Sequence, residues 1–111
     1  MEFIRITLQD RMRREQRAVF GAMSLRGIIM VSYATLVTLL GEPEDGDGDG
    51  SRAEWYLEFE DGTFATIYDW RETRPIEEVA CWHVGGEVNS PVLAMVAEAL
   101  ALTPLQVESM P

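Results

Sequence analysis

Three aspartates at alternate positions, Asp45, Asp47 and Asp49, are followed at once by Gly50 in an acidic, glycine-rich stretch. This spacing is typical of the first half of a calcium-binding loop, where carboxylates take ligand positions one, three and five and glycine takes position six. The second half of the pattern is missing, because position twelve is Tyr56 instead of a bidentate glutamate. We therefore predict a solvated acidic linker and no metal site, with weak binding of a divalent cation as the alternative.

The single cysteine, Cys81, and the single histidine, His83, stand two positions apart. A cysteine nucleophile normally meets its histidine base from a separate element, and it also needs an orienting group and oxyanion donors. The acidic loop is no phosphate cradle, since its aspartates would repel a phosphate from the backbone. We expect no catalytic residues, no cofactor and no enzymatic activity.

Alternating carboxylates form a second candidate group, with Glu54, Glu58 and Glu60 on one strand face and Asp69 diagonal to them. Carboxylates held together can raise one another's pKa, as glycoside hydrolysis requires. A small hairpin face without a cleft is a poor active site, however, and such stripes more often protect a sheet from edge pairing. We interpret Glu58 and Glu60 as part of a negative docking surface.

A β-hairpin must position these residues. The stretch "AEWYLEFEDGTFATIYDW" has two β-rich runs around Asp61-Gly62, a dipeptide favoured in two-residue type I′ turns. That turn puts one set of residues on the core face: Ala53, Trp55, Leu57, Phe59, Phe64, Thr66, Tyr68 and Trp70. The opposite face then carries Glu54, Tyr56, Glu58, Glu60, Thr63, Ala65, Ile67 and Asp69.

Two helices and a third strand complete the expected domain. Ser32 can cap a helix over "YATLVTLL", and Ser90 can cap a second one with Pro91 at its first position. Between hairpin and second helix, "EEVACWHVGG" reads as a strand broken by Gly85-Gly86. The sequence thus predicts an α+β domain over residues 31–103, a three-stranded antiparallel meander packed by two helices, followed by a tail over residues 104–111.

The first 30 residues are expected to form a basic N-terminal extension. "EFIRITL" alternates like a strand, and a helix from Asp10 to about Met23 would carry four arginines on one side. Such a face is more often solvated than bound to a membrane or nucleic acid. The extension is a candidate element for homo-oligomerisation, or a segment dispensable for the fold.

Charge is distributed unevenly along the chain. Residues 1–40 hold six arginines against three acids, and residues 41–111 hold three against sixteen, which sums to the net charge of −10. A body this negative repels phosphate, so nucleic acid is not an expected partner, whereas a basic protein is. No stretch has the roughly 20 apolar residues of a membrane span. With one cysteine and no secretory leader pattern, the expected location is the cytoplasm.

Several motifs occur in a fixed order: "SYATLVTLLGEP", "EWYLEFEDGTFATIYDW" and then "WHVGG" before a helix. Over about residues 31–101 the chain resembles a family of small accessory proteins encoded by bacteriophages. The resemblance implies a viral origin and carries over no catalytic residues. By analogy it favours a protein that acts in an infected bacterial host, binds a host factor and blocks a defence system.

The sequence therefore predicts a non-enzymatic binding protein for a host protein, with a small nucleotide ligand as the alternative. The aromatic segments "YDW" and "WHVGG" could stack a base or a partner side chain, and the nearby arginines could meet phosphate. The candidate binding residues are Glu58, Glu60, Tyr68, Asp69, Trp70, Arg71, Arg74, Trp82 and His83. For Trp82 and His83, structural roles in core and sheet are the competing interpretation.

Overall fold

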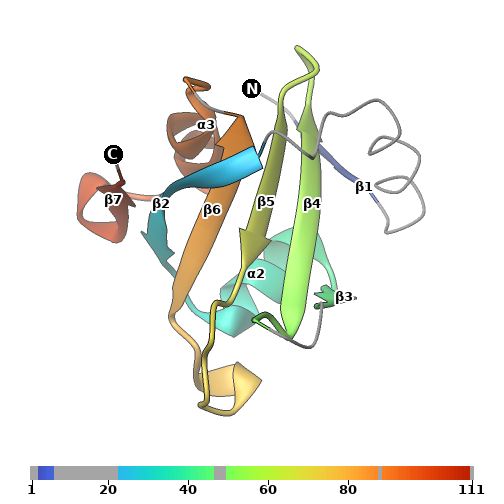
Figure 1. The fold of residues 1–111 in the computed structure, drawn as a ribbon, viewed down its shortest axis with the longest axis vertical. Coiled ribbons are helices and arrows are strands. Elements are labelled where there is room, and N and C mark those ends of the chain that lie inside the picture. Colours follow the sequence, from blue (N-terminus) through green and yellow to red (C-terminus); the bar gives the residue numbers. More distant parts are fainter. Residues whose placement is uncertain (1–2, 7–22, 47–49, 88, 111) are drawn as a thin grey trace.

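An antiparallel sheet forms one layer of the fold, and two helices cover one of its faces (Figure 1). The computed structural model describes residues 3–6, 23–46, 50–87 and 89–110. Along the path of the sheet the strands lie in the order β1-β4-β5-β6-β2-β7, and β3 pairs with β4. The strands are β1 (Phe3–Ile6), β2 (Met23–Met30), β3 (Glu44–Asp45), β4 (Ala53–Phe59), β5 (Phe64–Tyr68), β6 (Cys81–Glu87) and β7 (Val107–Ser109). The helices are α2 (Tyr33–Leu40) and α3 (Val92–Ala99), with 3₁₀ turns η2 (Ile76–Glu78) and η3 (Pro104–Gln106).

The α+β class is confirmed, and the predicted meander is the central part of a wider sheet. β4, β5 and β6 pair consecutively, as expected. β2 adds to β6 and β7 adds to β2, so strands 23–30 and 107–109 lie in segments that we placed outside the domain. Pairing between segments more than 50 residues apart leaves no local pattern, which is why the sequence did not reveal it. The expected strand in "EFIRITL" is present as β1, whereas the expected helix from Asp10 lies mostly outside the described residues.

The hairpin turn is one residue longer than the predicted type I′ turn. The amide of Gly62 donates to the carbonyl of Phe59 over 2.9 Å, and the amide of Phe59 donates to the carbonyl of Thr63 over 2.8 Å. Gly62 has a φ of 87°, whereas Asp61 lacks the positive φ that a type I′ turn needs at both central positions. The connection is a three-residue loop, a type I turn closed by a glycine bulge.

The longer turn shifts the strand register by one residue, so the side chains of β5 that were predicted to face solvent face the core. Trp55 faces Ile67 and Leu57 faces Ala65, and all four side chains are buried in the core. β4 therefore keeps its predicted core face, but β5 presents the other set of side chains. The prediction of core-facing positions is wrong for Phe64, Thr66, Tyr68 and Trp70.

We expect Gly62→Ala to lower the free energy of unfolding by about 1–2 kcal/mol, because a Cβ strains a residue held at positive φ. An added Cβ meets nothing within 4 Å, so the loss would report backbone strain alone. Urea unfolding of this variant and of Glu60→Ala, an exposed change in the same loop, measures the effect. Equal stability of the two variants would contradict the assigned turn.

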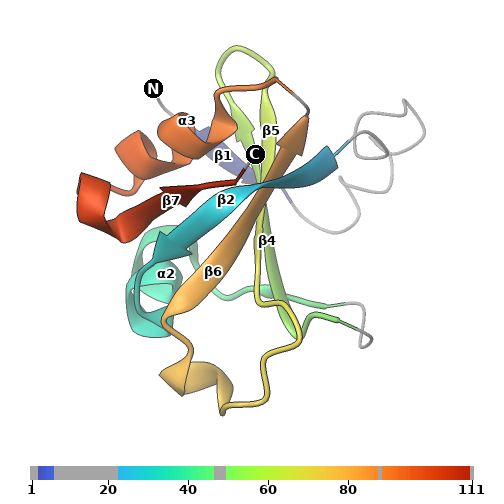
Figure 2. The same cartoon turned by 60° about the vertical axis from the view of Figure 1, so that its left-hand side comes forward.

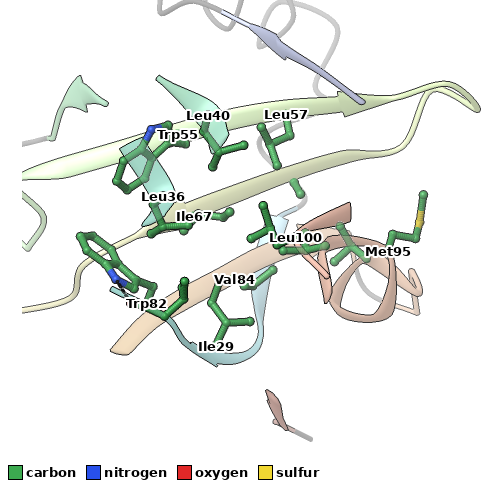
Figure 3. Close-up of a cluster of buried hydrophobic side chains, with 14 of the residues drawn as sticks. Ile29, Leu36, Leu40, Trp55, Leu57, Ile67, Trp82, Val84, Met95 and Leu100 are labelled. Carbon is green, nitrogen blue, oxygen red and sulfur yellow. Dashed lines mark hydrogen bonds between the residues drawn. The ribbon is translucent and has the colours of Figure 1, made fainter. Parts of the chain in front are cut away.

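The hydrophobic core lies between the helices and the sheet (Figure 3). Trp55 and Trp82 meet edge to face with ring centroids 5.3 Å apart, and both are fully buried. The indole of Trp55 donates to the carbonyl of Gly41 over 2.9 Å, and the indole of Trp82 donates to the carbonyl of Val31 over 3.0 Å. Both tryptophans thus satisfy their only polar group inside the core.

The helices begin and end largely as the sequence predicts. The hydroxyl of Ser32 accepts from the amide of Thr35 over 3.1 Å at the start of α2, and Gly41 ends that helix at a φ of 84°. α3 begins one residue later than predicted, because Pro91 takes the cap position and no side chain caps the helix. The expected break at Gly85-Gly86 is wrong. Both glycines continue β6, and a Cβ on Gly86 would meet Val92 of α3 at 2.4 Å.

Candidate functional site

A pocket of about 240 Å³ opens on the sheet face opposite the helices, which we call the outer face. β4 contributes Glu54 and Tyr56 to it, and the shifted register of β5 places Thr66 and Tyr68 beside them. One residue of the loop before β4 and one residue after β5 complete its wall. The lining residues are Ser51, Glu54, Tyr56, Thr66, Tyr68 and Trp70. The pocket thus joins a carboxylate to three aromatic rings.

Glu54 is the charged group of the pocket. The hydroxyl of Ser51 donates to Oε2 of Glu54, and the hydroxyl of Tyr56 donates to Oε1. These two bonds fix the carboxylate and leave further lone pairs for a ligand, because a carboxylate can accept about four hydrogen bonds. Burial and the charge of Glu54 raise the pKa of Tyr68, so its phenol stays protonated at neutral pH.

Aromatic rings form the rest of the pocket and its surroundings. Tyr68 meets Trp70 edge to face with centroids 6.4 Å apart, and it contacts the ring of His83 at 5.4 Å. Burial lowers the pKa of His83, so the imidazole is neutral at pH 7. Trp70 is 46% exposed and rests on Gly50, where an added Cβ would overlap the indole. Tyr68, Trp70 and His83, three of the predicted binding residues, lie next to one another, and the prediction placed the first two on the wrong face.

Asp69, a predicted binding residue, is buried and anchors the loop before β4. Its carboxylate accepts from the backbone amides of Arg52 and Ala53 over 2.8 and 3.0 Å and from Nε of Arg52 over 3.1 Å. The amide of Arg71 also donates to the carbonyl of Gly50. These bonds join the end of β5 to residues 50–53, so Asp69 positions the pocket wall and is 1% exposed.

Trp82 is separated from the pocket by the sheet itself. It belongs to the core, which supports the structural interpretation for this residue. Of the "WHVGG" segment, His83 and Gly85 lie beside Tyr68 and Thr66 of the pocket. The guanidinium of Arg71 lies 5.2 Å from the centroid of Trp70, whereas Arg74 pairs with Glu72 at 3.6 Å. Arg71 is thus at the edge of the pocket.

Of the predicted acidic stripe, Glu54 and Glu58 lie on the outer face, whereas Asp69 is buried against the loop before β4. Glu58 is partly buried opposite Phe64, and Glu60 is exposed in the hairpin loop. Sequence reasoning missed Ser51, Tyr56 and Thr66 as pocket residues. For Thr66 the signal is the hairpin turn, because its loop length decides which β5 residues share a face with Glu54. Tyr56 alternates with Glu54 in β4 and was already expected on the same face.

The calcium hypothesis rests on residues that the structure mostly leaves out. Asp47 and Asp49 lie outside the described residues, and Asp45 is the second residue of β3. Within the described ranges no three carboxylate, histidine or cysteine side chains gather in a way that could hold a metal ion. The amide of Gly46 donates to the carbonyl of Arg52 over 3.0 Å, which closes the base of the acidic loop.

Comparison of the chain with protein-family models, with curated proteins and with solved structures finds no match. None of the helices in the described residues combines the length and the apolar character that a membrane span needs.

Proposed function

We propose that this chain is a non-enzymatic binding protein whose outer-face pocket receives a basic side chain of a protein partner. The observation that carries the proposal is the position of Glu54 among three aromatic rings at an open pocket. A guanidinium or ammonium group can meet the carboxylate while its flat or apolar part lies against Tyr68 and Trp70. Aromatic side chains beside a carboxylate are a recurrent way to bind a cation.

The charge of the chain supports a basic partner. The net charge of −10 raises the local concentration of positively charged molecules and speeds their encounter with the acidic surface. Glu58 lies on the same sheet face as Glu54, so the two regions named from the sequence, acidic and aromatic, share one surface. The partner class that the bacteriophage resemblance suggests is a host protein, neutralised by occupation of its basic surface, as a counter-defence protein would do.

Catalysis is not part of the proposal. Burial, together with the charges of Glu108 and Glu72, raises the pKa of the Cys81 thiol, which makes it a poor nucleophile at neutral pH. His83 contacts Tyr68, and its lowered pKa keeps it neutral, so it provides a flat polar surface beside the pocket.

A nucleotide ligand remains the second candidate because Arg71 lies at the pocket edge. A base could stack on Trp70 while its phosphate met the Arg71 guanidinium, which is 5.2 Å from the indole centroid. Glu54 opposes this ligand, since a fixed carboxylate in the pocket repels phosphate.

We expect Trp70→Ala to weaken binding of a basic partner about tenfold, because the indole supplies one aromatic wall and is removed without loss of core packing. The probe is N-acetylarginine methylamide, titrated into the full chain while the signals of Thr66 and Tyr68 are followed by NMR. Leu105→Ala is the matched control, because Leu105 is 88% exposed and outside the pocket.

Glu54→Gln separates the two candidate ligands. It should weaken the arginine probe about tenfold and leave adenosine monophosphate unaffected or bound more tightly. If the arginine probe binds no better than the matched glutamine probe, the proposal of a basic partner fails. If adenosine monophosphate binds and Arg71→Ala removes that binding, the nucleotide alternative takes its place.

A further inference from the structure

On the helix side of the sheet, α3 packs against β2 and β7 (Figure 2). Residues of these three elements line a second pocket. Its volume is about 340 Å³. Leu93 and Ala94 of α3 and Val107 of β7 supply an apolar wall. The polar side chains of the lining are those of Arg26, Ser90 and Ser109. The sheet separates this pocket from the outer face, so an inference about it is independent of the proposed function.

Arg26 reaches this pocket because of a β-bulge. The pairing of β2 with β6 shifts between Leu25 and Gly27, so Arg26 is the extra residue. The bulge turns both Arg26 and Gly27 toward α3, and Gly27 approaches so closely that an added Cβ would meet Leu93 at 2.4 Å. Bulges often re-aim a side chain in this way near functional sites.

Two side-chain atoms of residues in the pocket wall are buried without partners. Nε of Arg26 and Oγ of Ser90 are inaccessible to solvent and make no hydrogen bond within the described part of the chain. Buried polar groups are nearly always satisfied, so each such atom requires an explanation. Both atoms belong to residues that line the same pocket, and both can donate a hydrogen bond.

The N-terminus of α3 adds a third group of hydrogen-bond donors near the pocket. No side chain caps this helix, and the first bond of its backbone runs from the amide of Met95 to the carbonyl of Pro91. The amides that precede Met95 in the first turn therefore point out of the helix end without an intrahelical acceptor. Such a helix end favours negative charge.

We propose that this pocket binds a small organic monoanion, a carboxylate on a short apolar body. The Nε–H of a guanidinium and its neighbouring terminal N–H form a planar pair that matches the two oxygens of a carboxylate. The Ser90 hydroxyl provides a further donor, and the apolar body packs on Leu93 and Val107. Arg26 is the one arginine that lines the pocket, and the chain as a whole has a net charge of −10. The pocket can therefore neutralise the single charge of a carboxylate better than the two charges of a phosphate.

The test is an NMR titration of the full chain with hexanoate as the probe. We expect saturable shifts of the Leu93, Ala94 and Val107 signals with hexanoate, and much weaker ones with hexanol, hexylamine or inorganic phosphate. Arg26→Gln should weaken hexanoate about tenfold or more, and Ser90→Ala about threefold. Arg74→Gln, an exposed arginine outside the pocket, is the control and should leave the affinity unchanged.

Four results would overturn the inference. Equal binding of hexanol would reduce the site to an apolar cavity, and equal binding of phosphate would make it a general anion site. Unchanged hexanoate affinity in Arg26→Gln, with the amide spectrum of the folded protein intact, would remove the guanidinium from the site. Shifts that fail to saturate would mean that the pocket holds water only.

Discussion

Replacing Asp69 with alanine is expected to lower the free energy of unfolding by about 2–4 kcal/mol. The carboxylate is 1% exposed and accepts from two backbone amides, those of Arg52 and Ala53, at 2.8 and 3.0 Å. Alanine leaves both amides without that acceptor in a site closed to solvent, and unpaired buried donors are costly. Urea unfolding followed by circular dichroism measures the loss.

Two further variants show which bond at Asp69 matters. Asp69→Asn keeps an oxygen for the amides and should cost only about 1 kcal/mol. Arg52→Gln removes the ion pair at 3.1 Å but leaves the amides bonded, and its cost should be at most about 1 kcal/mol, because the Arg52 side chain is 42% exposed. If Arg52→Gln costs as much as Asp69→Ala, the ion pair stabilises the loop, and our assignment of the amides is wrong.

Trp82→Ala is expected to cost about 3–5 kcal/mol, a large part of the total stability of a chain of this size. The indole is fully buried, lies edge to face with Trp55 at 5.3 Å and donates to the carbonyl of Val31. Alanine would leave a cavity and an unmatched carbonyl in the middle of the core. Urea unfolding again gives the value.

If the alanine variant does not fold, Trp82→Phe is the milder variant on which the free energy of unfolding and the probe affinity can still be measured. It retains an aromatic ring but loses the indole N–H, and we expect a cost of about 1–3 kcal/mol with the arginine-probe affinity unchanged. The candidate-ligand interpretation of Trp82 predicts the reverse, a small cost in stability and a loss of binding. The pair of measurements therefore distinguishes a core residue from a ligand residue.

The sequence predicted the elements whose patterns are local. Ser32 and the apolar spacing after it predicted α2 to the residue, and the alternation of "AEWYLEF" identified the core face of β4. The same alternation in β5 gave the wrong face, because Asp61-Gly62 suits both a two-residue and a three-residue turn. β2 was missed since the bulge at Arg26 interrupts its alternation, and its partner β6 is distant in the chain.

The sequence named several residues near the pocket, but it did not correctly predict which sheet face they occupy or how the strands align. Tyr68 and His83 are cross-strand neighbours in β5 and β6, and Trp70 follows Tyr68 by two residues, so these three named residues lie together. Glu54 was assigned to the opposite face from Tyr68, and only the observed register joins them. Arg26 could not be found from sequence, because its place depends on a bulge and on packing against α3.

Because hydrogen bonds hold both ends of the acidic loop, extra residues can be inserted into it at little cost in stability. Gly46 is bonded to Arg52 and Gly50 to Arg71, so both ends of the loop are held independently of the residues between them. Lengthening a loop with fixed ends costs little, about 0.6 kcal/mol for each doubling. The stretch between these glycines is therefore the natural place to insert an epitope tag or a fluorophore close to the pocket without disturbing its wall.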